Sequence, residues 1–176
     1  YPVSPEKIPA AIRSGRIAAL SKKPKNWLPA AEIRGEGLFL RFRTEAIDQW
    51  VEQNKGVSGR ADRLEQRSEA LAKDRGYDRD YRITPRLLLV HSFAHALIRT
   101  ISLECGYSPS SIRERLFVAE QEDEEAAMNG VLLYTGSPDS EGSLGGLVRL
   151  AEPELLVRVV MRTIRSAYWC GSDPVC

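Results

Sequence analysis

The chain of 176 residues has few cysteines and histidines, three and two respectively, and no long uninterrupted apolar run. An odd number of cysteines does not form the disulfide framework of a small secreted domain, and the sequence contains no signal peptide. The most apolar segment, from Thr84 to Cys105, includes both histidines and is not typical of a membrane span. These absences predict a cytoplasmic protein without membrane association.

Motifs for nucleotide binding and hydrolysis are also missing. No lysine follows the glycines of the loop from Ser137 to Gly146, so this is not a Walker A loop. The sequence has no G-x-S-x-G nucleophile elbow, and Ser92 follows His91 where a metalloprotease helix carries glutamate. We therefore expect a domain that is not an enzyme.

The charge of the chain is close to balanced but unevenly distributed. The net charge is +1, yet the first 43 residues contain nine lysines and arginines against three glutamates. Much of the compensating acid lies between Glu120 and Glu125. An ordinary solvated surface is one explanation; the other is weak, sequence-independent binding to DNA phosphates. The residues assigned to DNA are Arg16, Lys22, Lys23, Lys25, Arg41 and Arg43.

The apolar content of 43% is sufficient for one core, and the segment from Thr84 to Cys105 is its expected centre. Thr84 is a suitable N-cap, Pro85 occupies the first helical position, and Gly106 is a typical stop. Apolar residues cover most of the helix, which predicts burial on most sides. They are Leu88, Val90, Phe93, Ala94, Leu97, Ile98, Ile101 and Leu103.

The segments before the central helix predict a hairpin and further helices. A short helix from Ser4 to Gly15 is followed by strands at Trp27–Arg34 and Gly37–Phe42, with Gly35-Glu36-Gly37 as the turn. Thr44 is the expected cap of a helix that ends near Asn54. Residues 55–81 form either a solvated helix or a partly disordered connector, and a helix anchored by Leu64 and Leu71, with Ala61 and Ala70 as minor contacts, is favoured.

The segments after the central helix predict two strands and a last helix. Ser108 and Pro109 begin a short helix anchored by Ile112, and strands follow at Arg115–Ala119 and Gly130–Thr135. The helix that starts at Pro153 reaches Trp169 and Cys170. Its expected inward residues are Leu155, Leu156, Val159, Val160, Ile164 and Ala167.

The fold class is therefore α+β: a helix-dominated single domain around a buried central helix, with one or two small β-hairpins. Three segments are expected. Residues 1–55 form a basic arm, hairpin and helix, residues 56–83 a charged helical connector, and residues 84–176 the core. The chain begins without methionine and stops at Cys176, which suggests a piece of a longer protein.

Three groups of residues are candidates for a site. Cys170 and Cys176 offer two thiolates on a short turn, which is half of a tetrahedral zinc site, although two unrelated cysteines are an equally weighted alternative. His91 and His95 share one helix face and can bind a metal, but buried histidines paired with a carbonyl or carboxylate are favoured.

The loop from Ser137 to Gly146 is the third candidate. A nucleophilic Ser140 or Ser143 with His91 and Asp139 would support acyl transfer, but a structural turn is favoured. Cys105 is expected to be a small buried residue.

Several motifs in the second half of the chain resemble the MrfA-type zinc-binding domain. They are H-S-F-A-H-A-L-I-R from His91, G-V-L-L-Y-T from Gly130, S-P-D-S-E-G-S-L-G-G-L-V-R from Ser137, and W-C-G-S-D-P-V-C at the end. The upstream run W-L-P-A-A-E-I-R-G-E-G-L-F-L-R-F from Trp27 further resembles the DrmB family of the DISARM anti-phage system.

This resemblance implies a bacterial defence component that works on foreign DNA with a DrmA-like helicase. It also implies a zinc ion held by four cysteines, with Cys170 and Cys176 matching the first pair and the second pair expected downstream. The hypothesis is a non-catalytic domain that engages DNA and docks the helicase. The alternatives are a hydrolase using the Ser137–Gly146 loop with His91, and a purely structural scaffold for the helicase.

Overall fold

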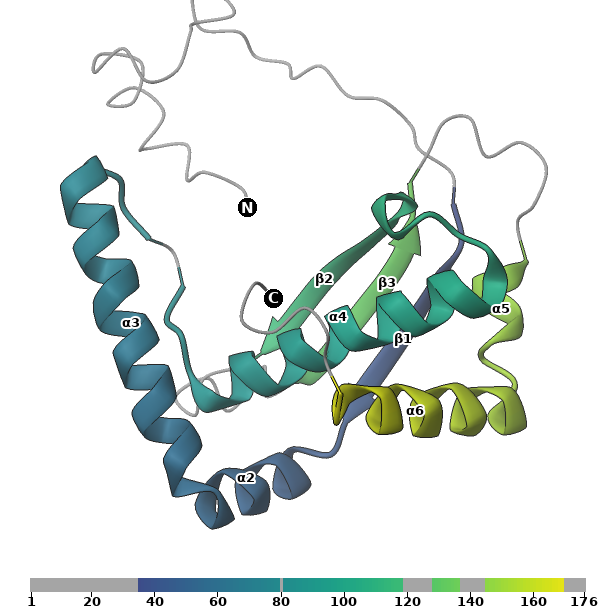
Figure 1. Ribbon diagram of the computed structural model, residues 1–176, viewed down its shortest axis with the longest axis horizontal. Coiled ribbons are helices and arrows are strands. Elements are labelled where there is room, and N and C mark those ends of the chain that lie inside the picture. The colour runs from purple at the N-terminus through teal and green to yellow at the C-terminus, as the bar shows by residue number, and fades with distance from the viewer. Residues whose placement is uncertain (1–34, 80, 119–127, 137–144, 170–176) are drawn as a thin grey trace, which may run out of the picture. The chain divides into compact units, whose positions relative to one another are not determined.

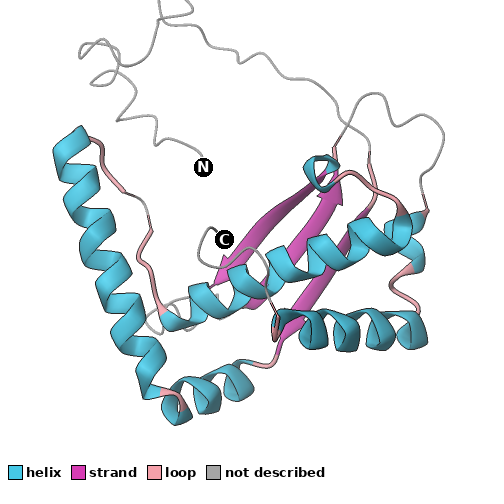
Figure 2. Ribbon diagram, viewed as in Figure 1, coloured by secondary structure: helices cyan, strands magenta, loops and turns pink. Residues whose placement is uncertain are grey.

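The computed structural model describes residues 35–79, 81–118, 128–136 and 145–169. Three antiparallel strands form one sheet in the order β1-β3-β2, and the described helices include one that runs along this sheet (Figures 1 and 2), which confirms the α+β class. The elements are β1 (Gly37–Phe42), α2 (Thr44–Gln53), α3 (Lys55–Arg75), α4 (Pro85–Cys105), the 3-10 turn η1 (Pro109–Ser111), β2 (Ile112–Val118), β3 (Asn129–Thr135), α5 (Gly146–Arg149) and α6 (Pro153–Ala167).

The central helix α4 begins and ends where the sequence predicts. The Thr84 hydroxyl accepts a hydrogen bond from the Leu87 amide at 3.2 Å, which satisfies one of the free donors of the first turn. At the other end Gly106 has φ 74°, a left-handed conformation that glycine adopts without steric cost.

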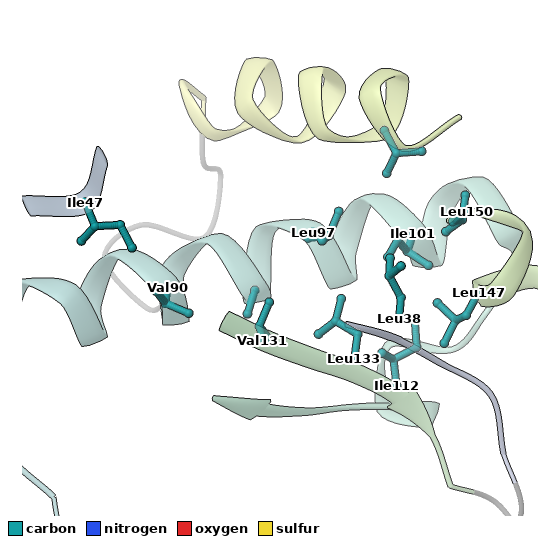
Figure 3. Packing of buried hydrophobic residues seen from close by; sticks show 12 residues of the cluster. Leu38, Ile47, Val90, Leu97, Ile101, Ile112, Val131, Leu133, Leu147 and Leu150 are labelled. Carbon is teal, nitrogen blue, oxygen red and sulfur yellow. The ribbon is translucent and has the colours of Figure 1, made fainter. Parts of the chain in front are cut away.

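One side of α4 forms the core with the sheet. Val90, Ala94, Leu97 and Ile101 are each at most 1% exposed and belong to one core cluster with Val131 and Leu133 of β3. Figure 3 shows Val90, Leu97 and Ile101 along α4, with Val131 and Leu133 on the strand beneath it. Burial of α4 is less complete than predicted, because Leu103 is 85% exposed. The helix packs mainly against α6, β2 and β3, with smaller contacts to α2, α3 and η1.

By length and composition alone, α4 is apolar enough to cross a membrane. The central helix of a globular domain meets the same criterion, and the apolar side of α4 is already covered by the sheet.

The sheet combines strands from distant parts of the sequence. β3 pairs with β2 over Ile112–Val118 and with β1 over Gly37–Phe42, both antiparallel. The expectation that the two later strands are neighbours is confirmed. Ile112 was expected in a short helix, which is wrong, because the chain is extended from this residue onward and only η1 precedes it. The partner strand expected at Trp27–Arg34 lies outside the described residues.

The helices α2 and α3 confirm the secondary structure expected for residues 44–75. Of the expected contacts on α3, burial of Ala61 is confirmed, but Ala70 is exposed. Thr44 does not cap α2; its hydroxyl accepts a hydrogen bond from the Asn129 side chain instead. On α3, Leu64 and Leu71 are each 42% exposed, whereas Ala61 and Ala72 are buried. These alanines are about three turns apart on one face, so small side chains allow close approach of the neighbouring helices.

The last helix, α6, packs against α4 through a narrow stripe. Val159 and Thr163 are almost fully buried and Leu156 touches the core. Ile164 was expected to face inward but is 43% exposed, because the contact with α4 covers little more than one side of α6.

All described residues belong to one of the two units into which the chain divides, Ile33–Cys176. The finer division at residues 55/56 and 83/84 stays a prediction, and the helix expected from Ser4 to Gly15 lies outside the described residues.

Candidate nucleic-acid interface

The face of the sheet that is turned away from α4 carries a distinct set of side chains. Successive residues of a strand point to opposite faces, and the core residues Leu38, Ile112 and Leu133 fix which face is inner. None of the described helices covers the other face (Figure 2). We call this the outer sheet face; its members are Gly37, Phe39 and Arg41 of β1, Arg113, Arg115 and Phe117 of β2, and Gly130, Leu132 and Tyr134 of β3.

The register arranges these nine residues in three rows across the sheet. Gly37, Tyr134 and Arg113 form the first row, and Phe39, Leu132 and Arg115 form the second. Arg41, Gly130 and Phe117 form the third. Each row therefore has one arginine on an edge strand.

Two phenylalanines meet across the central strand of this face. The rings of Phe39 and Phe117 are 5.6 Å apart between centroids and nearly perpendicular, at 84°. Gly130 lies between them and makes the contact possible: a Cβ at this position would lie 2.8 Å from the Leu40 carbonyl oxygen and 3.0 Å from the Phe39 ring. Phe39 remains 44% exposed, so part of the aromatic pair faces outward.

The outer sheet face is positively charged. Arg41, Arg113 and Arg115 are exposed, and the Arg115 guanidinium lies 5.4 Å from the Phe117 centroid. Among the nine outward residues of the described strands there is no carboxylate, because the alternation turns Glu114 to the other side. Aromatic rings between arginines suit single-stranded nucleic acid, whose bases stack on the rings while phosphates approach the guanidinium groups.

The sequence located only part of this surface. Of the six residues assigned to DNA, Arg41 lies on the outer sheet face, and Arg43 is exposed immediately after β1. The other four, Arg16, Lys22, Lys23 and Lys25, lie outside the described residues. Arg113 was missed because this strand was expected to start at Arg115, whereas β2 begins at Ile112. Arg115 and Phe117 were placed in the expected strand but were not assigned to DNA. The alternating pattern R-E-R-L-F was the signal that could have identified them.

The other candidates from the sequence have varied outcomes. Cys170 and Cys176 lie outside the described residues, as do Asp139, Ser140 and Ser143. Cys105 was expected to be buried, which is wrong: it is exposed, because the last turn of α4 extends past the core.

The two histidines are brought together with Glu114. The side chains of His91 and His95 are 48% and 54% exposed, so the expectation that they are buried is wrong. The expected carboxylate partner is present, because Glu114 lies beside both rings.

Glu36, which was expected in a hairpin turn, is instead a buried clamp. Its carboxylate accepts hydrogen bonds from the Tyr107 hydroxyl and from the amides of Gly145 at 2.8 Å, Leu147 at 3.0 Å and Val148 at 3.2 Å. It thereby ties the start of β1 to α5. Burial alone would raise the pKa of Glu36, but these hydrogen bonds outweigh it and hold the pKa below its ordinary value of 4.5.

The same clamp predicts a loss of stability at both extremes of pH. Because the folded pKa of Glu36 is lowered, its contribution is present above about pH 4.5 and is lost as the pH falls through the folded value. Burial and the bond to Glu36 raise the pKa of Tyr107 to about 12, so its contribution is present below its ordinary pKa of 10.0 and is lost as the pH rises toward 12. Urea unfolding across this range measures both limbs. Tyr107→Phe should remove the alkaline limb and weaken the acid limb, because the Tyr107 hydroxyl is one of the donors that lower the pKa of Glu36.

Comparison with known proteins finds two similarities, one to a domain family and one to a curated protein. Residues 93–176 match the MrfA Zn-binding domain. The chain is 38% identical over 153 residues to the DISARM protein DrmB of Bacillus paralicheniformis (strain ATCC 9945a / NCIMB 11709 / CD-2). The aligned residues make up 86% of this chain and 26% of the relative. The chain thus spans about a quarter of that relative's length. Both resemblances expected from the motifs are confirmed.

Proposed function

We propose that this chain, which carries a match to the MrfA Zn-binding domain and is similar to DrmB of DISARM, is part of a bacterial anti-phage complex. In this complex it engages DNA and docks a DrmA-like helicase, and it catalyses no reaction itself. The observation that carries the proposal is the outer sheet face, where three arginines lie around a partly exposed aromatic pair and none of the nine outward residues is acidic.

Single-stranded DNA is the form that this surface suits best. The Phe39–Phe117 pair offers flat apolar surface for unstacked bases, which a duplex keeps inside its helix. Arg41 on one edge strand and Arg113 and Arg115 on the other can each neutralise one phosphate. Three such contacts predict that the logarithm of the affinity falls with the logarithm of salt concentration with a slope of about −2.

The helicase partner is proposed to dock on the outer face of α6. Val157, Met161, Ile164 and Tyr168 are between 43% and 80% exposed and follow the spacing of one helix face. Such an apolar stripe fits a groove of a partner protein. The proposed location of the complex is the cytoplasm, where foreign DNA is met.

Zinc enters this proposal through the family. Cys170 and Cys176 supply two thiolates, which are suitable donors for half of a closed structural site, and two further ligands would come from outside this segment. When bound, the ion would supply folding energy and no chemistry to a substrate.

The test measures DNA binding and helicase association separately in the full-length protein. Arg113→Glu/Arg115→Glu should weaken binding of a single-stranded oligonucleotide by at least about tenfold at low salt, because two attractions become repulsions. Phe39→Ala should cost about 1–3 kcal/mol per stacked base. Fluorescence anisotropy of a labelled oligonucleotide gives the affinity, and co-purification gives helicase association.

Two controls separate the roles. Arg63→Glu/Arg67→Glu makes the same charge change on exposed α3 and should leave the affinity nearly unchanged. Met161→Glu on α6 should weaken helicase association and preserve DNA binding. DNA affinity that is independent of salt, or equal losses in the α3 and sheet variants, would disprove the interface. If the domain is only a scaffold, it will bind the helicase, and neither Arg113→Glu/Arg115→Glu nor Phe39→Ala will change the affinity for DNA.

A further inference from the structure

A second constellation lies on the inner side of the sheet, between α4 and β2. His91 and His95 are one helical turn apart on α4, and Glu114 is the inward-facing residue of β2 opposite them. His91 Nε2 lies 2.9 Å from His95 Nε2 and 3.1 Å from Glu114 Oε1, and His95 Nε2 lies 3.5 Å from the same oxygen. Three potential ligand atoms from two elements therefore converge on one point.

The separations are those of ligands around one metal ion. Zinc–nitrogen and zinc–oxygen bonds of about 2.0–2.2 Å in a tetrahedron place neighbouring ligand atoms about 3.3 Å apart. The three observed separations bracket this value. A pair of histidines linked by an ordinary hydrogen bond does not require a carboxylate oxygen at similar distance from both rings.

The carboxylate of Glu114 provides an independent indication. Its second oxygen, Oε2, is buried and has no hydrogen-bond partner among the described residues. A buried carboxylate oxygen without a partner loses its hydration without compensation, which costs free energy. A cation bound at Oε1 would offset the negative charge of the carboxylate and so lower the cost of burying Oε2.

We propose that His91, His95 and Glu114 bind a zinc ion at a site separate from the cysteine ligands of the family. Two imidazoles and one carboxylate suit zinc and similar transition ions, whereas calcium and magnesium prefer oxygen ligands. Three protein ligands leave one position open. A hollow of about 580 Å³ borders His95, Glu114 and Arg113, so water or an anionic group can occupy that position.

This site would also join α4 to β2 by metal bonds. The three ligands come from a helix and a strand that already pack together, so the ion would stabilise the folded state without rearrangement. The proposal does not rest on DNA binding, since its three ligands lie on α4 and on the side of β2 that faces α4, and none of them belongs to the outer sheet face. Arg113 borders the hollow but is not a ligand.

Cobalt substitution in the full-length protein tests the site. After removal of metal with a chelator, Co²⁺ bound by nitrogen and oxygen gives d–d absorption without the near-ultraviolet charge-transfer band of thiolate ligands. We expect one equivalent with this signature beside the thiolate-bound equivalent of the cysteine site. His95→Ala and Glu114→Gln should each abolish the first equivalent and leave the thiolate band intact.

Ser92→Ala is the matched control, because Ser92 is an exposed neighbour on the same helix and should leave both equivalents in place. Circular dichroism checks that the variants are folded. When the cysteine site is already filled, added Zn²⁺ should raise the melting temperature of the wild-type protein but not that of His91→Ala. The proposal is overturned if folded His95→Ala retains both equivalents, or if it loses the thiolate band together with the d–d absorption.

Discussion

Replacing Glu36 with alanine is expected to lower the free energy of unfolding by at least about 3 kcal/mol. The variant leaves three backbone amides and the Tyr107 hydroxyl without their shared acceptor, and each unsatisfied buried group costs about 1–3 kcal/mol. The loss is less than additive, since water enters the space that the carboxylate leaves. The same side chain connects the start of β1 to α5.

Urea unfolding followed by circular dichroism measures the effect. Glu36→Gln keeps one acceptor oxygen and should cost less than Glu36→Ala, while Glu52→Ala on the exposed side of α2 should change stability by no more than about 0.5 kcal/mol. A Glu36→Ala variant as stable as Glu52→Ala would show that the clamp contributes little to folding.

Leu97→Ala is expected to cost about 2–5 kcal/mol, because Leu97 is fully buried in the core between α4 and the sheet. Leu103 provides an internal control of the same residue type on the same helix. It is 85% exposed, so Leu103→Ala should change stability by no more than about 0.5 kcal/mol. Denaturant unfolding of the two variants gives the difference directly. Equal costs would contradict the arrangement of α4 on the sheet.

Features that depend on neighbouring residues could be predicted from the sequence. The ends of α4 follow from a capping threonine, a proline at the first position and a glycine at the stop, all within one segment. The helix at 55–75 and the pairing of the two later strands likewise follow from local patterns.

Features that depend on distant residues could not be predicted in this way. Glu36 meets Gly145 across 109 positions of sequence, and nothing in its own segment distinguishes it from a turn residue. The cluster of His91 with Glu114 requires the register of β2 against α4. Hydrophobicity favoured Leu64 and Leu71 as the main anchors of α3, but the buried residues are Ala61, which was expected only as a minor contact, and Ala72, which was not expected.

The pairing of β1 with β3 determines which residues a fragment of this protein must contain in order to fold. The stretch that matches the MrfA Zn-binding domain starts within α4, whereas β1 precedes it by many residues and pairs with the middle strand along six positions. A fragment cut at the boundary of the match would lack β1, so the backbone groups on that edge of β3 would be unpaired, and α5 would lose its hydrogen bonds to Glu36. An unpaired strand edge favours aggregation. The folded unit is therefore longer than the stretch that matches the domain family. A transfer of this unit into another protein must include β1.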